Sequence, residues 1–172
     1  MNIINKVNTE LLGELVCIAD SDGNSKMWGK YKECSLFKEQ NKIFIGMDLY
    51  CYNENFETNI FSVQRGLDAQ NKLAITYKKF LDDLDDGLET IILKKIDDFL
   101  DEEEISISTV KLQDIKAVEI RIYMDGYAVI MKVPFLNHLI GFQNRKIFDE
   151  NNWKNVNFED SIDPVEMKYG VV

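Results

Sequence analysis

The amino-acid sequence predicts a single α+β domain spanning residues 1–172. The first and last thirds of the chain carry short runs of β-branched and aromatic residues, which favour strands, whereas the middle third has apolar residues at helical spacing. A hydrophobic content of 45% with only two prolines indicates one packed core without a proline-rich linker. We therefore expect a mainly antiparallel sheet, made from N- and C-terminal strands, packed on a central helical hairpin.

Three strands are predicted in the first third, at residues 15–18, 31–37 and 43–50, with a turn signal at 39–41. The last two of these strands should pair as a hairpin, and Trp28 should cover their sheet. Side chains alternate along a strand, so one face of the third strand carries the apolar residues Ile43, Ile45, Met47 and Leu49. That face should meet the core.

Two amphipathic helices are predicted in the middle third. Apolar residues recur at spacings of three, four or seven over residues 63–84, and Ser62 is placed as the N-cap of this helix. A second apolar stripe covers residues 88–100, with Asp85 or Asp86 placed to cap its first turn. The short turn between the stripes predicts that the helices run antiparallel.

The last third of the chain returns to strands. Residues 118–124 and 127–133 are predicted as a hairpin, because Asp125-Gly126 between them is typical of a type I′ turn. Residues 139–142 are predicted as a further strand. The segment 149–163 is rich in Asn and Asp and is expected at the surface.

Negative charge is concentrated in one part of the chain. Residues 82–104 contain eleven carboxylates and two lysines, so nine of the ten net negative charges fall within 23 residues. Carboxylates at the end of a helix oppose its dipole, at a cost of about a few tenths of a kcal/mol each. Although such a run can simply be a solvated helix face, the local excess also favours a binding surface. The candidate contact residues are Asp82, Asp83, Asp85, Asp86, Asp97, Asp98, Asp101, Glu102, Glu103 and Glu104.

The net charge of −10 disfavours binding to nucleic acids and anionic membranes, because both require a positive surface. The three lysines within residues 26–32 are too few for such a surface. No run reaches the roughly 20 apolar residues of a membrane span, and the N-terminus lacks an uninterrupted apolar signal core. We expect a cytoplasmic protein whose three cysteines, Cys17, Cys34 and Cys51, are reduced.

No motif assigns catalytic chemistry, a metal or a cofactor. A calcium loop counted around Gly87 lacks its second ligand and its bidentate Glu, and one around Gly23 fails likewise. The single histidine, His138, lies in an apolar stretch that favours a structural role over that of a catalytic base, and no ligand spacing joins it to the cysteines in a zinc site. No glycine-rich nucleotide-binding loop occurs. We therefore predict a protein that is not an enzyme.

The order of the predicted elements resembles a group of known proteins. Trp28 in the N-terminal β region, Gln64 and Gln70 leading the helices, and the closing pattern at 137–142 are similar to small bacterial domains of unknown function encoded near polymorphic toxins. The resemblance covers residues 28–145. It departs where those domains carry a polar-aromatic pair and this chain has Val133, Pro134 and Phe135. The resemblance implies an immunity or accessory protein that sequesters a partner.

These observations give a functional hypothesis. The protein is predicted to sequester a basic partner, such as a bacterial toxin, through its acidic surface, and to block that partner by occlusion. Phe99 and Tyr77 are candidate aromatic anchors. One alternative is a small hydrolase or transferase with a cleft between sheet and helices, and another is a structural protein that self-associates through a sheet edge. The sequence leaves the oligomeric state open.

Overall fold

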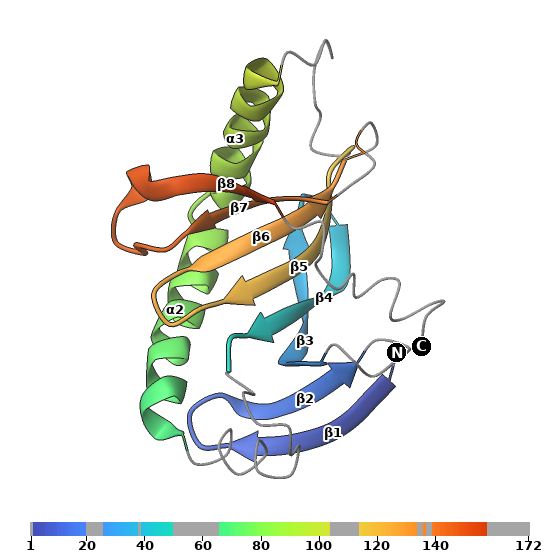
Figure 1. The fold of residues 1–172 in the computed structure, drawn as a ribbon, viewed down its shortest axis with the longest axis vertical. Helices are drawn as coiled ribbons and strands as arrows, with labels where there is room; N and C mark the ends of the chain where they lie inside the picture. Colours follow the sequence, from blue (N-terminus) through green and yellow to red (C-terminus); the bar gives the residue numbers. More distant parts are fainter. Residues whose placement is uncertain are drawn as a thin grey trace.

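The described residues of this computed structural model are 2–19, 26–37, 39–49, 66–103, 114–133, 136 and 139–157. Among these described residues, four strands precede two α-helices, and four strands follow them (Figure 1). The N-terminal strands are β1 (Asn2–Thr9), β2 (Gly13–Ala19), β3 (Lys26–Leu36) and β4 (Glu39–Met47). The helices are α2 (Leu67–Asp85) and α3 (Leu88–Glu102). The C-terminal strands are β5 (Lys116–Ile122), β6 (Tyr127–Lys132), β7 (Ile140–Asn144) and β8 (Trp153–Asn157).

The described strands form one sheet whose order in space follows their order in the chain. Each strand pairs antiparallel with the next, except for β4 and β5, which pair in parallel. A parallel pair needs a connection that returns the chain to the starting end of the sheet, and α2 and α3 lie within that connection. The prediction of a mainly antiparallel sheet in an α+β fold is therefore confirmed.

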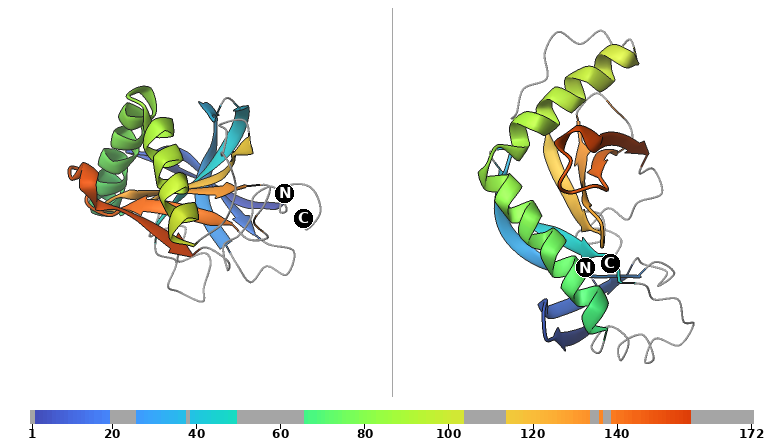
Figure 2. Two further views of the ribbon diagram at one scale, coloured as in Figure 1. Left: turned by 90° about the horizontal axis from the view of Figure 1, so that it is seen from above. Right: turned by 90° about the vertical axis from the view of Figure 1, so that its left-hand side faces the viewer.

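The helices do not form the predicted antiparallel hairpin. In Figure 1 and in the right-hand view of Figure 2, α3 continues onward from the end of α2 instead of folding back beside it. Asp86 ends α2 by donating its backbone N–H to the carbonyl oxygens of Asp82 and Asp83. Gly87, at a φ of 102°, is the N-cap of α3, and no side chain caps this helix, so the predicted Asp cap is also wrong. The two linking residues bend the chain without reversing it.

The helices bury one apolar stripe against one face of the sheet. Leu73 and Phe80 of α2 and Ile92 of α3 are fully buried in a core that includes Leu15, Ile45 and Val129 of the sheet. The predicted facing of β4 is confirmed, because Ile43, Ile45 and Met47 belong to this core while Phe44 packs on the opposite face. Trp28 is a buried core residue of β3.

Of the strands in the described part of the chain, six lie close to the predicted positions, and two were missed. The predicted strands correspond to β2, β3, β4, β5, β6 and β7, whereas β1 and β8 lie in segments whose polar residues concealed them. The turn between β3 and β4 comes earlier than residues 39–41, because Leu36 already pairs with Glu39 and Phe37 adopts a positive φ of 55°. Ser62, Cys51 and His138 lie outside the described residues.

The β5–β6 hairpin is present, but its turn is not type I′. Tyr123 donates its backbone N–H to the Gly126 carbonyl at 2.8 Å, which encloses a four-residue loop. A type I′ turn needs a positive φ that Gly126 does not have. Gly126 instead allows β7 to approach, since a Cβ atom there would lie 1.8 Å from the Asn144 carbonyl oxygen.

Candidate protein-binding surface

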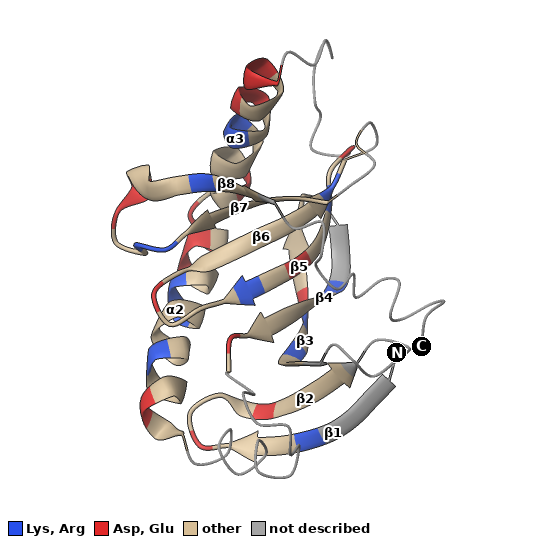
Figure 3. Cartoon of the chain, viewed as in Figure 1, with Lys and Arg blue, Asp and Glu red and all other residues tan. Residues whose placement is uncertain are grey.

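The structure divides the predicted acidic residues into two groups. Asp82, Asp83, Asp85 and Asp86 lie where α2 ends, while Asp97, Asp98, Asp101, Glu102 and Glu103 lie on the last turns of α3 (Figure 3). The nearest members of the two groups, Asp86 and Asp97, are 11 residues apart, which corresponds to a rise of about 16 Å at 1.5 Å per helical residue. The candidate residues therefore form two acidic patches and not one continuous surface. Glu104 lies outside the described residues.

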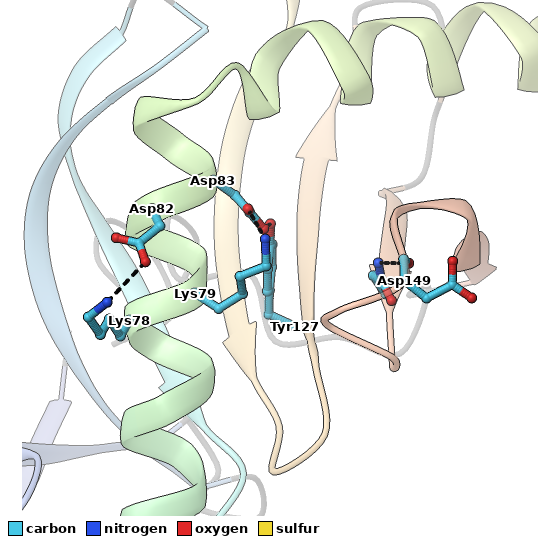
Figure 4. Close-up of polar contacts among 7 residues, drawn as sticks. Lys78, Lys79, Asp82, Asp83, Tyr127 and Asp149 are labelled. Atoms are coloured by element: carbon cyan, nitrogen blue, oxygen red, sulfur yellow. Dashed lines mark hydrogen bonds and ion pairs between the residues drawn. The ribbon is translucent and has the colours of Figure 1, made fainter.

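Asp83 has a structural role in the first group. It accepts a hydrogen bond from the Tyr127 hydroxyl at 2.6 Å and pairs with Lys79 at 2.5 Å, joining α2 to β6 (Figure 4). Burial, and then the hydrogen bond to Asp83, raises the pKa of Tyr127, while the hydrogen bond to Asp83 raises the pKa of Lys79. Asp83 is thus committed to helix–sheet packing, and the prediction that it contacts a partner stays untested.

Two further carboxylates of the acidic segment contact described residues of the protein itself. Asp82 pairs with Lys78 at 3.2 Å on the exposed side of α2 (Figure 4). Glu89 accepts a hydrogen bond from the backbone N–H of Phe37 at 2.5 Å and so fixes the β3–β4 turn against α3. Asp85 and Asp86 remain exposed at the helix bend.

The second group occupies the end of α3, which extends beyond the sheet (Figures 1 and 3). All five carboxylates are exposed, and within the described part of the chain none of them forms a salt bridge. Partial burial, followed by the charges of Asp101 and Asp98, raises the pKa of Asp97. We call Asp97, Asp98, Asp101, Glu102 and Glu103 the α3 acidic end.

The predicted aromatic anchors do not extend into solvent. Phe99 and Tyr77 are half-buried and pack against the core. The Lys30 ammonium also lies 4.8 Å from the centre of the Tyr77 ring. Neither residue provides the exposed aromatic side chain that an anchor requires.

Within the described residues, the exposed aromatic side chain is that of Phe148, which was not among the predicted site residues. Its side chain is 84% exposed, whereas no other exposed large hydrophobic residue in the described part of the chain exceeds 50%. It lies in the loop between β7 and β8. The signal in the sequence is the apolar pair of Ile147 and Phe148 beside an Asn- and Asp-rich segment. Of this pair, Ile147 packs against the core.

A second unpredicted feature is a set of charged and aromatic residues on the sheet face opposite the helices. Glu119 is fully buried and pairs with Arg121 at 2.9 Å. Burial alone would lower the pKa of Arg121, but the carboxylate of Glu119 outweighs this effect, so the pKa of Arg121 is raised. The Arg145 guanidinium lies 4.0 Å from the centre of the Tyr123 ring and pairs with Asp125. This cluster lies on β5 and its neighbouring loops, and the pairing of Glu119 with Arg121 offsets part of the cost of burying the Glu119 charge.

The interface between sheet and helices, where the alternative hypothesis places a cleft, is filled by core side chains in the described part of the chain. Among those same residues, no group of three His, Cys, Asp or Glu side chains could hold a metal ion. Neither described helix has the length and apolar character needed to cross a membrane. Comparison with protein families, curated proteins and solved structures finds no match. The prediction that the protein is not an enzyme stays untested.

Proposed function

We propose that this protein binds a basic protein partner through the α3 acidic end and blocks it by occlusion, as a cytoplasmic inhibitor or immunity protein would block a toxin. The observation that supports the proposal is the placement of five exposed carboxylates, without ion pairs to described residues, on the last turns of a projecting helix. Such a patch attracts positive surfaces and excludes acidic ones.

The position of these carboxylates is unfavourable for α3 itself. Asp97 and Asp101, and likewise Asp98 and Glu102, are like charges at i,i+4 spacing, which destabilises a helix. All five also lie at the negative end of the helix dipole. A binding role explains why stability is given up here, since residues that serve function often conflict with the local rules of folding.

The test is retention of proteins from the lysate of the native host on the immobilised chain. We expect a basic protein to be retained, and to be lost when Asp98, Asp101 and Glu102 become Asn, Asn and Gln. The matched control removes the same charge from exposed positions outside α3, by Glu10→Gln, Glu14→Gln and Glu33→Gln. The control should retain the partner, and retention should fall with added salt.

Equal loss of the partner in both triple variants would show that net charge, and not the α3 acidic end, governs binding. Retention of the partner by all variants at high salt would contradict a charge-driven interface. Either result would overturn the proposal.

A further inference from the structure

Two half-buried lysines lie on the sheet face that α2 covers. Side chains alternate along β3, and Cys34 belongs to the core beneath the helices, so Lys30 and Lys32 project from the same face as Cys34. The Lys30 ammonium group lies 4.8 Å from the centre of the Tyr77 ring of α2, which agrees with this placement. Burial, and then the charge of Lys32, lowers the pKa of Lys30. The two ammonium groups are therefore close enough to repel each other.

Neither lysine is paired with a carboxylate in the described part of the chain. Lys30 donates one hydrogen bond, to the Leu12 carbonyl at 2.9 Å, and no described residue forms a hydrogen bond or ion pair with the Lys32 ammonium group. Glu33, the nearest acidic residue in the chain, projects from the opposite face of the sheet. Lysines are seldom buried without a partner, so this positive charge calls for an anion from outside the described residues.

Cys34 and Tyr77 complete the surroundings without adding negative charge. Burial raises the pKa of the Cys34 thiol by more than the charge of Lys32 lowers it, and burial also raises the pKa of the Tyr77 hydroxyl. Both groups therefore keep their protons at neutral pH. A charge on Cys34 would act on Tyr77, so the two side chains lie near each other. The Tyr77 hydroxyl forms no hydrogen bond with a described residue and remains available as a donor.

The lysines lie where the described pairing of β2 with β3 ends. That pairing covers Lys26 to Gly29 of β3, whereas β3 continues alongside β4 as far as Leu36. The aliphatic stems of Lys30 and Lys32 pack on the core face, and their charged ends reach toward water at the side of β3 that β2 leaves. A small solute can therefore contact the ammonium groups without disturbing the core.

We propose that Lys30, Lys32 and Tyr77 form a binding site for the phosphate group of a small molecule. Alternate residues of a strand lie about 6.6 Å apart, so two flexible lysines can reach one compact anion. A phosphate group carries nearly two negative charges at neutral pH and offers three acceptor oxygens, which match two ammonium groups and one hydroxyl. The site lies apart from the α3 acidic end and does not depend on the proposed function.

The test is an NMR titration of the full chain with inorganic phosphate, at an ionic strength held constant with chloride. We expect saturable shifts around β3 and a rise in the pKa of Lys30 when phosphate is bound. Lys32→Met keeps the apolar stem and should weaken phosphate binding by about tenfold or more, because a charge-assisted hydrogen bond is lost. Lys116→Met removes an exposed lysine of β5 as the matched control and should change binding less than about twofold.

A second variant tests the site without removing a charge. Tyr77→Phe keeps the ring that packs on the core and should weaken phosphate binding by about threefold, the effect of one neutral hydrogen bond. Near-ultraviolet circular dichroism checks that each variant is folded.

Other outcomes overturn the inference in distinguishable ways. Shifts that grow with phosphate without saturating, or an equal loss in Lys116→Met, would reduce the effect to general attraction between charges. Acetate that binds as well as phosphate would assign the site to carboxylates. Unchanged phosphate binding by Lys32→Met, together with new self-association, would mean that the lysines only protect the side of β3 from pairing with another chain.

Discussion

At the scale of single residues, Asp83 joins two elements that are far apart in the sequence. Its carboxylate accepts from the Tyr127 hydroxyl of β6 and pairs with Lys79 one turn earlier on α2. Tyr127 is fully buried, so its hydrogen bond to the Asp83 carboxylate is stronger than an exposed one, whereas Lys79 is only half-buried. The Tyr127 ring also packs edge to face with Phe80 and Trp153. The side chains at this point hold α2 against the sheet.

We expect Tyr127→Phe to lower the free energy of unfolding by about 2 kcal/mol, since a hydrogen bond to a charged acceptor is lost while the ring remains. Urea unfolding measures the change. In an Asp83→Asn background the same substitution should cost less, because the charged acceptor is already absent. Strict additivity of the two substitutions would contradict a direct coupling between these side chains.

Glycine is required at position 126 because of close packing, and not because of the backbone conformation. A Cβ atom at this position would lie 1.8 Å from the backbone oxygen of Asn144, which cannot move as a flexible side chain can. Gly126→Ala should therefore destabilise the protein by about 3 kcal/mol. The control is Gly13→Asn, where nothing lies within 4 Å and Asn tolerates the φ of 74°, so the change should be small. Thermal unfolding compares the two, and equal losses would contradict the steric explanation.

At the scale of elements, α3 combines a buried stripe with an end that is poorly suited to a helix. Leu88, Ile92 and Ile96 repeat every four residues and are fully buried, which holds the first turns on the sheet. The α3 acidic end has like charges at the wrong end of the dipole. The pKa of Asp97 is raised, so its contribution to stability is present below the unfolded value of 3.8 and is lost as pH rises through the folded pKa.

We expect Asp101→Lys to raise the free energy of unfolding at neutral pH by about 0.5–1 kcal/mol, because it removes a repulsion and favours the dipole. The gain should shrink at high salt and at pH below the carboxylate range. Urea unfolding at two salt concentrations measures it. The same substitution should weaken partner binding, so stability and binding should change in opposite directions. A loss of stability would contradict the electrostatic explanation for this end of the helix.

At the scale of the whole molecule, the tyrosines couple stability to alkaline pH. The pKa values of Tyr31, Tyr77, Tyr123 and Tyr127 are all raised, mainly by burial. Above the unfolded value of 10.0, the unfolded chain releases these protons while the folded chain keeps them. Stability should therefore be maintained below about pH 10 and fall as pH rises further.

The alkaline decline can be measured by urea unfolding across this pH range. Tyr127→Phe should reduce the slope by about 1.4 kcal/mol per pH unit, the contribution of one proton. An unchanged slope would mean that Tyr127 does not retain its proton in the folded protein.

Sequence patterns predicted those parts of the molecule that depend on local chemistry. Alternation in β4 and the four-residue repeat of α3 report directly on which side chains are buried, so the α+β class and six strands could be predicted. The edge strands β1 and β8 could not, because an edge strand needs fewer apolar residues. The direction of α3 relative to α2 depends on the backbone of Asp86 and Gly87, and periodicity carries no such information.

The candidate site was predicted in part for the same reason. The charge of the acidic segment is visible in the sequence, but the pairing of Asp83 with Tyr127 and of Glu89 with Phe37 depends on contacts between distant residues. Phe148 could not be identified either, because the apolar pair of Ile147 and Phe148 does not reveal which of the two side chains is buried. The division of the acidic segment into two groups also follows from the way α3 leads away from the end of α2 instead of folding back beside it (Figure 2).

The single parallel strand pair bears on how the protein folds. Among the described strands, the antiparallel pairs join neighbours along the chain, whereas β4 and β5 are separated by the residues between Met47 and Lys116. Closing a long loop is slow because chain entropy is lost before contacts form. We therefore expect the two groups of antiparallel strands to form early and their junction at β4–β5 to form last. Substitutions at Ile45 or Ile120, on either side of this junction, should speed unfolding far more than they slow folding.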